Sequence, residues 1–496
     1  MSERTDQSLT RKKLDKTLKP HWVWAIALGS SIGWASFVMP ATWMGQAGPL
    51  GVILGLTIGA LLMVIIAISY GVLIRNYPVS GGEFAYAFLS LSRVHAYISG
   101  WFLTLGYICI VALNATAFSL MLKFIFPNFI EQMKIYEIAG WEVYLTEIIF
   151  ATILIGIFTL LNIRGAGLSG RMQFTFVAIL ILGVLAITTM MTSNPDTSFS
   201  NLSPVFSPEI SSLAAILTMV AIAPFAYVGF DNVPQAAEEF KFSSKKALSL
   251  IVLAIFFAAG IYSLMIVATG VAAPWQQISD ANHSWGTGYV VQEILGNGGL
   301  VILAVALSMG IFTGLNGFLI SSSRVLFAMS RGKVLPKPFS KLHPKYNTPY
   351  IALIFAALVA IIAPWFGREV LGWVVDMSSV GVSIAFFYTT YTAYKLLKWN
   401  DDGSDFDPEK NIVSPGKKFV ALLGMIASVS FLALLLIPGS PAALGMESLV
   451  ALIVWVVIGA VFYLFIKKDL ATYSREELAY LILGNDKFKL KKEEDQ

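Results

Sequence analysis

Two short runs of small and polar residues interrupt long apolar segments of this 496-residue chain. The first run is residues 29–33 (GSSIG), and the second is residues 225–231 (FAYVGFD). Because hydrocarbon offers no water to unpaired backbone N–H and C=O groups, an unwound stretch persists there only where it lines a cavity. Paired breaks in corresponding positions of two halves are typical of the binding site of a secondary transporter. We therefore expect both runs to contribute to one site.

The backbone groups released by such breaks would suit a small zwitterion. The second half of the first broken segment begins near Trp34, so its free N–H groups and positive dipole end would attract a carboxylate. Carbonyl groups released in both runs would attract an ammonium group. The glycines alone would be explained equally well by helix packing, but the second break favours a binding site. The candidate substrate-binding residues are Ser30, Ser31, Ile32, Gly33, Trp34, Ala35, Phe225, Ala226, Val228 and Gly229.

Three aromatic side chains and one carboxylate could control access and energy coupling. Phe225 and Trp34 stand beside the breaks, where an aromatic ring could act as a lid over the substrate. Tyr107 and Asn316 are further candidates for the pocket, although interhelical hydrogen bonds would also explain them. For Asp231 two interpretations stay open. It either caps the following half-helix, or it couples transport to protons or cations, since an ionisable group at membrane depth is costly.

The composition predicts an all-α polytopic membrane protein. Hydrophobic residues make up 56 % of the chain, charged residues only 13 %, and the mean hydropathy is +0.73. Such a chain is too apolar for an ordinary soluble domain. About twelve segments are long enough to cross the hydrocarbon. They are residues 22–44, 49–74, 95–126, 143–161, 168–191, 208–237, 247–272, 297–329, 349–365, 370–395, 417–438 and 448–466.

The basic residues predict the orientation of these segments. With both termini in the cytoplasm, all Lys and Arg except Lys123, Lys134 and Arg368 fall on the cytoplasmic side, as the positive-inside rule requires. We therefore expect an integral protein of the plasma (inner) membrane. The net charge of +4 comes from these flanking residues, and no basic groove interleaved with aromatics suggests nucleic-acid binding.

The positions of the breaks divide the chain into two repeats. They fall in the first and sixth segments, and because five is odd, the second set of five crosses the membrane in the opposite sense. We interpret residues 478–483 as part of a solvated tail rather than as an amphipathic helix. The expected units are an N-terminal tail (1–21), repeat 1 (22–192), repeat 2 (208–398), a cytoplasmic linker (399–416), two further helices (417–466) and a C-terminal tail (467–496).

Four stretches carry a resemblance to a known family. They are residues 29–33 with Phe37; residues 78–86 (PVSGGEFAY); residues 225–231 with 237–239 (AEE); and Ser323-Arg324 with 328–331, 335–336 and 348–349. Together they resemble the amino acid permeases of the amino acid, polyamine and organocation (APC) superfamily of transporters, from about residue 22 to residue 466.

This resemblance implies the LeuT-like fold, that of the sodium-coupled leucine transporter, and an α-amino acid or related amine as substrate. It implies that the N–H groups of Trp34 and Ala35 hold the substrate carboxylate. It further implies that carbonyl groups of Ser31, Phe225 and Val228 hold the ammonium group. The aromatic ring at position 225 would close the outer side, and residues 80–83 would lie in an inner loop that moves during gating.

Two departures from the family pattern bear on this expectation. Trp34 and Ala35 stand where many members have glycine or serine, so an indole and a methyl group intrude on the carboxylate site. Leu180 replaces a lysine that many members carry seven residues after a glutamine matching Gln173. A charge from that lysine therefore cannot stand in for a sodium ion here.

We expect a permease or exchanger for an amino acid, with a small or neutral side chain favoured. The alternatives are an amine or polyamine transporter of the same fold, and a transport-inactive amino acid sensor. Proton coupling through Asp231 and exchange without ion coupling are both considered, and a sodium site near Ser321, Ser322 and Ser323 is less favoured. No phosphate-binding loop or metal-ligand spacing occurs, so we predict neither an enzyme nor any cofactor or metal.

Overall fold

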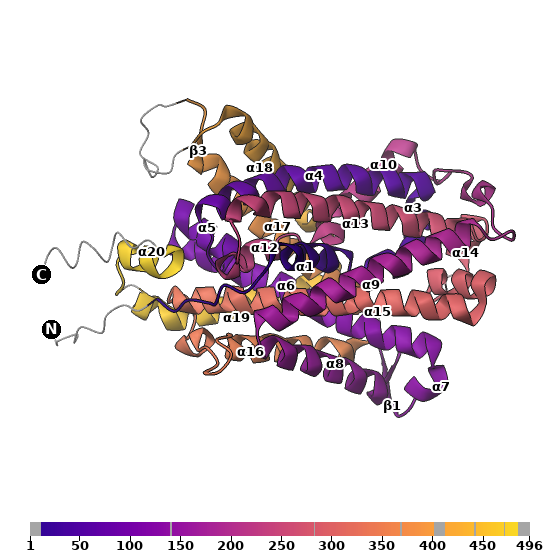
Figure 1. Cartoon of the computed structure of the whole chain (residues 1–496), viewed down its shortest axis with the longest axis horizontal. Coiled ribbons are helices and arrows are strands. Elements are labelled where there is room, and N and C mark those ends of the chain that lie inside the picture. Colours follow the sequence, from indigo (N-terminus) through magenta and orange to yellow (C-terminus); the bar gives the residue numbers. More distant parts are fainter. Residues whose placement is uncertain are drawn as a thin grey trace, which may run out of the picture.

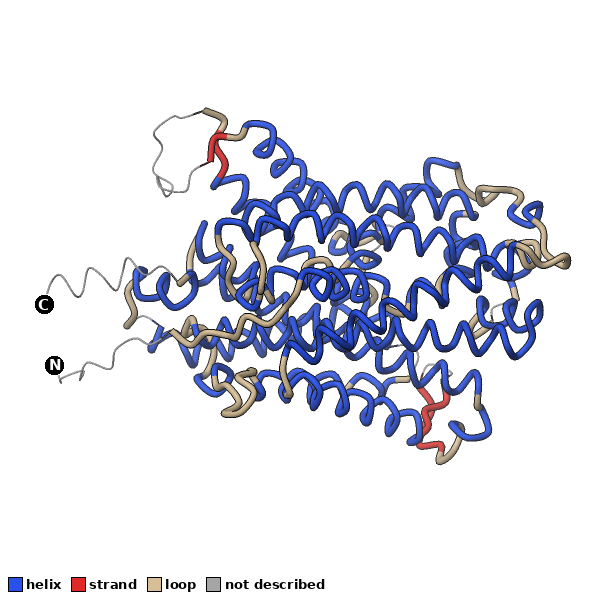
Figure 2. The backbone as a smooth tube through the Cα atoms, in the orientation of Figure 1, coloured by secondary structure: helices blue, strands red, loops and turns tan. Residues whose placement is uncertain are grey.

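The computed structural model forms a bundle of helices whose long members run side by side along the longest axis (Figures 1 and 2). It describes residues 11–138, 141–281, 283–367, 370–400, 412–440, 443–470 and 472–484. Parts of four predictions lie outside these residues: the ends of both tails, Arg368 and most of the linker 399–416.

The first half of the chain begins with a broken helix. Helix α1 ends at Ile32, Gly33 takes a positive φ of 51°, and α2 begins at Ala35. Glycine adopts this backbone conformation without the steric cost that a side chain would bring. The predicted first break is confirmed, but it lies at Gly33 and Trp34, since residues 29–32 of the predicted run are still helical. The elements of this half are α1 (Pro20–Ile32), α2 (Ala35–Val38), α3 (Pro40–Ala47), α4 (Pro49–Asn76), α5 (Gly82–Ser90), α6 (Arg93–Ile125), α7 (Pro127–Ile130), β1 (Lys134–Ile138), β2 (Trp141–Tyr144), α8 (Leu145–Ile163), α9 (Ala166–Thr192) and the 3₁₀ turn η1 (Phe199–Leu202).

The second half begins with the second broken helix. Helix α11 ends at Tyr227, Gly229 has a φ of 129°, and α12 begins at Asn232, so this break is confirmed as well. The elements are α10 (Ser212–Ala221), α11 (Ala223–Tyr227), α12 (Asn232–Gln235), η2 (Ala237–Glu239), η3 (Ser244–Lys246), α13 (Ala247–Gly270), α14 (Trp275–Asp280), α15 (Gly286–Arg331), η4 (Lys337–Ser340), α16 (Tyr350–Ala360), η5 (Ala363–Phe366), α17 (Val370–Leu396), β3 (Leu397–Lys398), β4 (Ile412–Val413), α18 (Pro415–Leu436), α19 (Met446–Leu470) and α20 (Arg475–Leu483).

Nine helices in the described part of the chain are long and apolar enough to cross a bilayer. Each of them coincides with one of the twelve predicted segments. The other three predicted segments correspond to the two broken helices and to the short pair α16 and η5. The chain is therefore an all-α polytopic membrane protein. The nine helices are α4, α6, α8, α9, α13, α15, α17, α18 and α19.

Two features differ from the sequence-based expectation. Residues 134–138 and 141–144 form an antiparallel pair of strands, β1 and β2, which hydropathy does not detect because the strands are only five and four residues long. The interpretation of residues 478–483 as solvated tail is wrong. They belong to α20, where Leu478, Leu481 and Ile482 are buried because the helix packs against α5 and α15.

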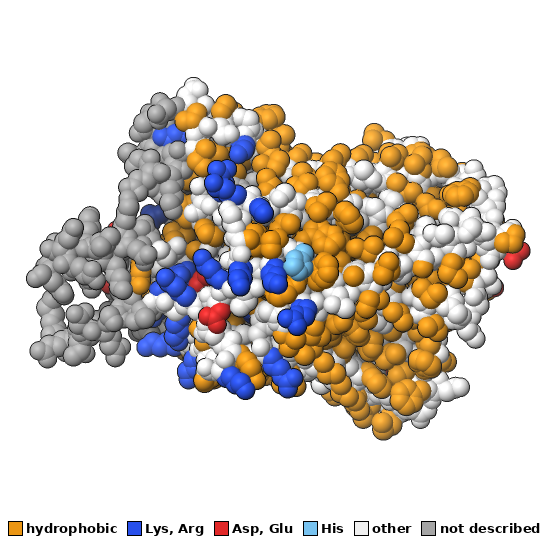
Figure 3. Space-filling view, viewed as in Figure 1, with side chains coloured by type: hydrophobic (Ala, Val, Ile, Leu, Met, Phe, Trp, Pro, Cys, Tyr) orange, Lys and Arg blue, Asp and Glu red, His pale blue; other side chains and the backbone are white. Residues whose placement is uncertain are grey.

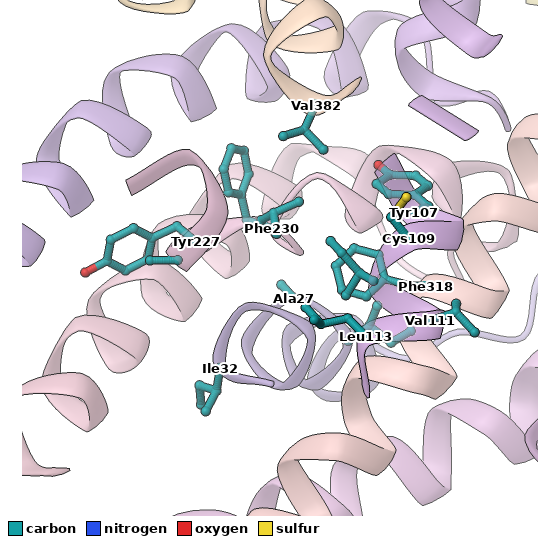
Figure 4. Packing of buried hydrophobic residues seen from close by; sticks show 14 of the residues in the cluster. Ala27, Ile32, Tyr107, Cys109, Val111, Leu113, Tyr227, Phe230, Phe318 and Val382 are labelled. Carbon is teal, nitrogen blue, oxygen red and sulfur yellow. The ribbon is translucent and has the colours of Figure 1, made fainter. Parts of the chain in front are cut away.

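The two breaks lie against each other in the interior. A Cβ atom on Gly229 would come within 2.5 Å of the backbone nitrogen of Ser31, so only glycine permits this approach. On the other side, a Cβ atom on Gly310 of α15 would lie 2.2 Å from the carbonyl oxygen of Gly33. Buried side chains such as Phe230 fill the space around the breaks (Figure 4).

Basic side chains gather at one end of the bundle, as the face in Figure 3 shows. The first and last described residues meet there, since a Cβ atom on Gly484 would lie 3.2 Å from Cζ of Arg11. We call this end, which holds Arg11, Glu238 and Arg331, the basic end. Helices α3, α7 and α14 lie at the opposite end (Figure 1).

We expect Gly310→Ala to lower the melting temperature of the purified protein. The added methyl group would press on the backbone oxygen of Gly33, and overpacking of this kind costs roughly 1–3 kcal/mol. Gly260→Ala on α13 is the matched control, since nothing lies within 4 Å of its Cβ position. Equal melting temperatures for the two variants would contradict the close approach of α15 to the first break.

Candidate functional site

A cavity of about 970 Å³ enters the bundle from the end opposite the basic end. Its lining comes from α3, the end of α6, the loop before α15 and the start of α17. Trp34 and Phe225, the two predicted lids, both line it. The other predicted binding residues are not part of the lining, and most of them are buried. The aromatic rings therefore lie between the cavity and the breaks.

Carbonyl groups of both breaks converge on one hydroxyl group. Tyr262 of α13 places its hydroxyl 3.1 Å from the carbonyl oxygen of Ser31 and 2.9 Å from that of Ala226. A phenol donates a single hydrogen, so it can satisfy only one of the two oxygens at a time. Sequence reasoning missed Tyr262, because Ser263 and other hydroxyl residues lie in the same span and nothing in the sequence sets Tyr262 apart.

Further hydroxyl groups and free backbone groups surround the breaks. The hydroxyl of Ser31 lies 3.0 Å from the carbonyl oxygen of Tyr227, and Thr313 of α15 donates to the carbonyl of Gly29 at 2.9 Å. Within the described residues, the N–H groups of Trp34 and Ala35 have no backbone acceptor, as is usual at the start of a helix. The site thus contains N–H groups without a backbone acceptor, and carbonyl groups whose hydrogen-bond donors are side-chain hydroxyl groups.

Asp231 lies at the second break and is completely buried. One carboxylate oxygen accepts the N–H of Gly229 at 2.7 Å, and the other accepts the hydroxyl of Tyr107 at 2.9 Å. The side chain makes no capping hydrogen bond to α12, so the N-cap interpretation is wrong. The interhelical hydrogen-bond explanation of Tyr107 is confirmed.

Glu83 is a second buried carboxylate, and hydrogen bonds connect it to Asp231. The family resemblance implied only that this residue lies in an inner loop that moves during gating. The amide nitrogen of Gln235 lies 3.3 Å from the Tyr107 hydroxyl and also donates to Glu83. Tyr70 donates its hydroxyl to the other oxygen of Glu83 at 2.8 Å. No Lys or Arg of the described chain pairs with either Asp231 or Glu83. A polar chain therefore links the second break to α5 and α4.

Asn316 and Gln173 form a separate amide network. The amide nitrogen of Asn316 donates to the side chain of Gln173 at 2.8 Å. Gln173 donates to the carbonyl oxygens of Ala25 and Thr313 at 3.3 Å and 3.1 Å. Asn316 thus makes the ordinary interhelical hydrogen bonds considered for it. The nearby Ser322 also donates within its own helix.

Ion pairs close the basic end. Arg324 binds Glu239 through two nitrogens at 2.8 Å and 3.2 Å, and both side chains are buried. Glu238 pairs with Arg331 at 2.9 Å and with Arg11 at 3.1 Å. Burial works against ionisation of Glu238, but the two guanidinium groups hold its pKa below the ordinary value. This contribution to stability is present above the ordinary glutamate pKa and is lost as the pH falls through the lowered value.

Comparisons with known proteins identify the family of the chain. The sequence profile of the family described as amino acid permease matches residues 22–461. The branched-chain amino acid permease BcaP of Bacillus subtilis (strain 168) is 27 % identical over 466 residues, 91 % of this chain and 93 % of the relative. The methylthioribose transporter of the same organism is 26 % identical over 74 % of this chain and 79 % of its own length. The lysine-specific permease LysP of Escherichia coli (strain K12) is 25 % identical over 77 % and 78 %.

We expect Tyr262→Phe to destabilise the protein and to weaken ligand binding. Loss of the hydroxyl leaves buried carbonyl groups of Ser31 and Ala226 unpaired, and an unsatisfied buried group costs about 1–3 kcal/mol. Thermal unfolding of the purified protein measures the effect. Tyr391→Phe removes a hydroxyl with no hydrogen bond among the described residues and serves as the control. If both variants unfold at the wild-type temperature, Tyr262 does not hold the breaks together.

Proposed function

This chain belongs to the amino acid permease family, and we propose that it transports an α-amino acid across the membrane by alternating access. The contact between the two broken helices carries the proposal. Their carbonyl groups face one hydroxyl of Tyr262, and unpaired N–H groups begin α2 nearby. A bound zwitterion would satisfy both sets of backbone groups at once.

In the proposed complex, the substrate carboxylate accepts hydrogen bonds from the N–H groups of Trp34 and Ala35. The ammonium group donates to carbonyls of Ser31, Phe225 and Val228. The Val228 carbonyl accepts no hydrogen bond from the described residues, which supports its assignment. The remaining predicted contacts are Ser30, Ile32, Gly33, Ala226 and Gly229.

Two aromatic rings would gate this site. Trp34 and Phe225 line the cavity, and we propose that they separate to admit the substrate and close over it afterwards. Tyr107 would take part through its hydrogen bonds with Asp231. The ion pairs of Glu238 and Glu239 keep the opposite path shut until the occluded state forms.

The proposed orientation follows the positive-inside rule. The basic end would face the cytoplasm, with both termini there, and the cavity would open to the outside of the plasma membrane. The five-plus-five inverted repeat and the LeuT-like arrangement of twelve crossings belong to the same proposal. The positions of the two breaks, first and sixth in the series, support it.

We propose a neutral side chain for the substrate. Near the breaks the cavity is lined by Trp34, Phe225, Ile222 and Leu307, which suits an apolar group. Glu147, an acidic residue at the outer end of a span, is neutralised by Lys123 at 2.8 Å. A relative with a similar length is named as a branched-chain amino acid permease, which is consistent with this choice.

The substrate assignment predicts a defined pattern of uptake. Protein reconstituted in liposomes should exchange labelled neutral amino acids such as leucine or alanine for the same unlabelled amino acid. Their decarboxylated amines should not compete, because they lack the carboxylate for the N–H groups of α2. Phe225→Ala should reduce exchange at least tenfold by removing a lid.

The same assay separates the alternatives, with Phe256→Ala on the exposed face of α13 as the matched control. Exchange of diamines without amino acids would contradict the zwitterion site and favour an amine transporter. Tight binding of an amino acid without any exchange would identify a sensor instead.

We further propose that Asp231 couples transport to protons. Its carboxylate is buried without a basic partner among the described residues, and it bonds directly to Gly229 in the break. Protonation would weaken the bond to the N–H group of Gly229 and thereby change the geometry of the break.

Asp231→Asn should abolish accumulation driven by an imposed proton gradient while leaving substrate exchange. The variant keeps the shape of the side chain, but its amide cannot take up and release a proton as a carboxylate does. Accumulation in liposomes, with Asp280→Asn on the exposed surface as control, measures the difference. Gradient-driven accumulation by Asp231→Asn at the wild-type rate would rule out this role.

A further inference from the structure

A small basic pocket lies at the basic end, away from the central cavity. Its volume is about 410 Å³, and its lining includes Lys16, Lys19, Arg171 and Lys241, together with Trp22 and Thr17. No acidic side chain belongs to this lining. We refer to it as the basic pocket.

Among the described residues, the four cations of the basic pocket have no carboxylate partner. Within the described residues, none of them takes part in an ion pair within 4 Å, whereas Arg11, Arg324 and Arg331 at the same end all do. Lys19 lies over the ring of Trp22, with 5.2 Å between its Nζ and the ring centroid. Four uncompensated positive charges around one pocket repel each other unless an anion enters.

Backbone hydrogen bonds hold these residues together. The N–H of Leu18 donates to the carbonyl of Glu239 at 3.0 Å, and the N–H of Lys241 donates to the carbonyl of Leu18 at 2.9 Å. This pairing joins the N-terminal segment to the chain after η2. It therefore brings Lys16 and Lys19 next to Lys241, while α9 supplies Arg171.

An apolar face of α9 continues from the pocket into the membrane region. Leu168 lines the pocket and is exposed, and Ile179 and Leu182 follow on the same side of the helix as Arg171. Their separations of three, eight and three residues along a helix of 3.6 residues per turn keep all four near one side. Phe174 and His21 form an edge-to-face ring contact near the pocket. Figure 3 shows basic side chains bordering hydrophobic surface on this face.

We propose that the basic pocket binds the phosphate headgroup of an anionic phospholipid, whose acyl chains lie along the exposed face of α9. The cations recognise the phosphate group, and the adjoining apolar face distinguishes a lipid from free phosphate. The bound lipid braces the N-terminal segment against α9 while the basic end is closed. This site is independent of the transported substrate.

Thermal unfolding of the full-length protein in detergent tests the site. Phosphatidylglycerol should raise the melting temperature, whereas phosphatidylcholine with the same acyl chains and inorganic phosphate should not. The variant with Lys16, Lys19, Arg171 and Lys241 changed to Gln should lose this rise. The matched control changes four exposed lysines outside the pocket to Gln: Lys245, Lys246, Lys337 and Lys341.

Each departure from this pattern overturns the proposal. An equal loss of the rise in both quadruple variants would mean that diffuse surface charge attracts the lipid. An equal rise with phosphatidylcholine would mean that the headgroup charge is not recognised, and an equal rise with phosphate would assign the pocket to free anions.

A second, milder variant covers the case in which the quadruple variant fails to fold. Arg171→Gln alters one exposed position on α9 and should retain fewer phosphatidylglycerol molecules than wild type in native mass spectrometry. Undiminished retention by this variant would also overturn the proposal.

Discussion

The structure depends on hydrogen-bond partners for the backbone N–H and C=O groups at the two points where a membrane helix is interrupted. In hydrocarbon each unpaired N–H or C=O group costs several kcal/mol, so a break persists only if neighbouring residues supply partners. Here the hydroxyl groups of Tyr262, Ser31 and Thr313 and the carboxylate of Asp231 supply them. Gly229 allows this arrangement, because any side chain at that position would separate the two breaks.

In the proposed transport cycle, different kinds of interaction separate the breaks from the two ends of the bundle. On the cavity side, the aromatic residues Trp34 and Phe225 line the cavity, and in the proposed cycle their rings would move aside without breaking an ion pair. At the basic end, Arg324 and Glu239 are both buried and bonded through two nitrogens. Separating such a pair leaves two buried charges without a partner or water. Opening of the basic end therefore requires water to enter as the two side chains move apart. The ion pairs therefore favour a fully closed or a fully hydrated state over intermediates.

The sequence predicts the parts of this structure that the bilayer itself imposes. Long apolar segments must be helical, and glycine with polar residues inside them marks a break, so α4 and the two breaks were predictable. Tyr262 and Gln235 were not, because each acts through partners distant in the chain. Helix α20 was misread for a similar reason. Its short apolar face has meaning only beside the surface of α5 and α15 that buries it.

Asp231 illustrates how a residue type can draw attention to a position whose contacts the sequence does not predict. A carboxylate beside a helix break suggested a cap on the following helix. Instead, it accepts hydrogen bonds from the N–H of Gly229, two residues earlier, and from the hydroxyl of Tyr107 on α6. Through Gln235 the same chain of hydrogen bonds reaches Glu83 on α5, near the ion pairs of the basic end. A change of charge at Asp231 would act directly on the hydrogen bonds of the break and, through Tyr107 and Gln235, on those of Glu83. The proposed proton coupling would therefore act on the second break and on α5 through one set of hydrogen bonds.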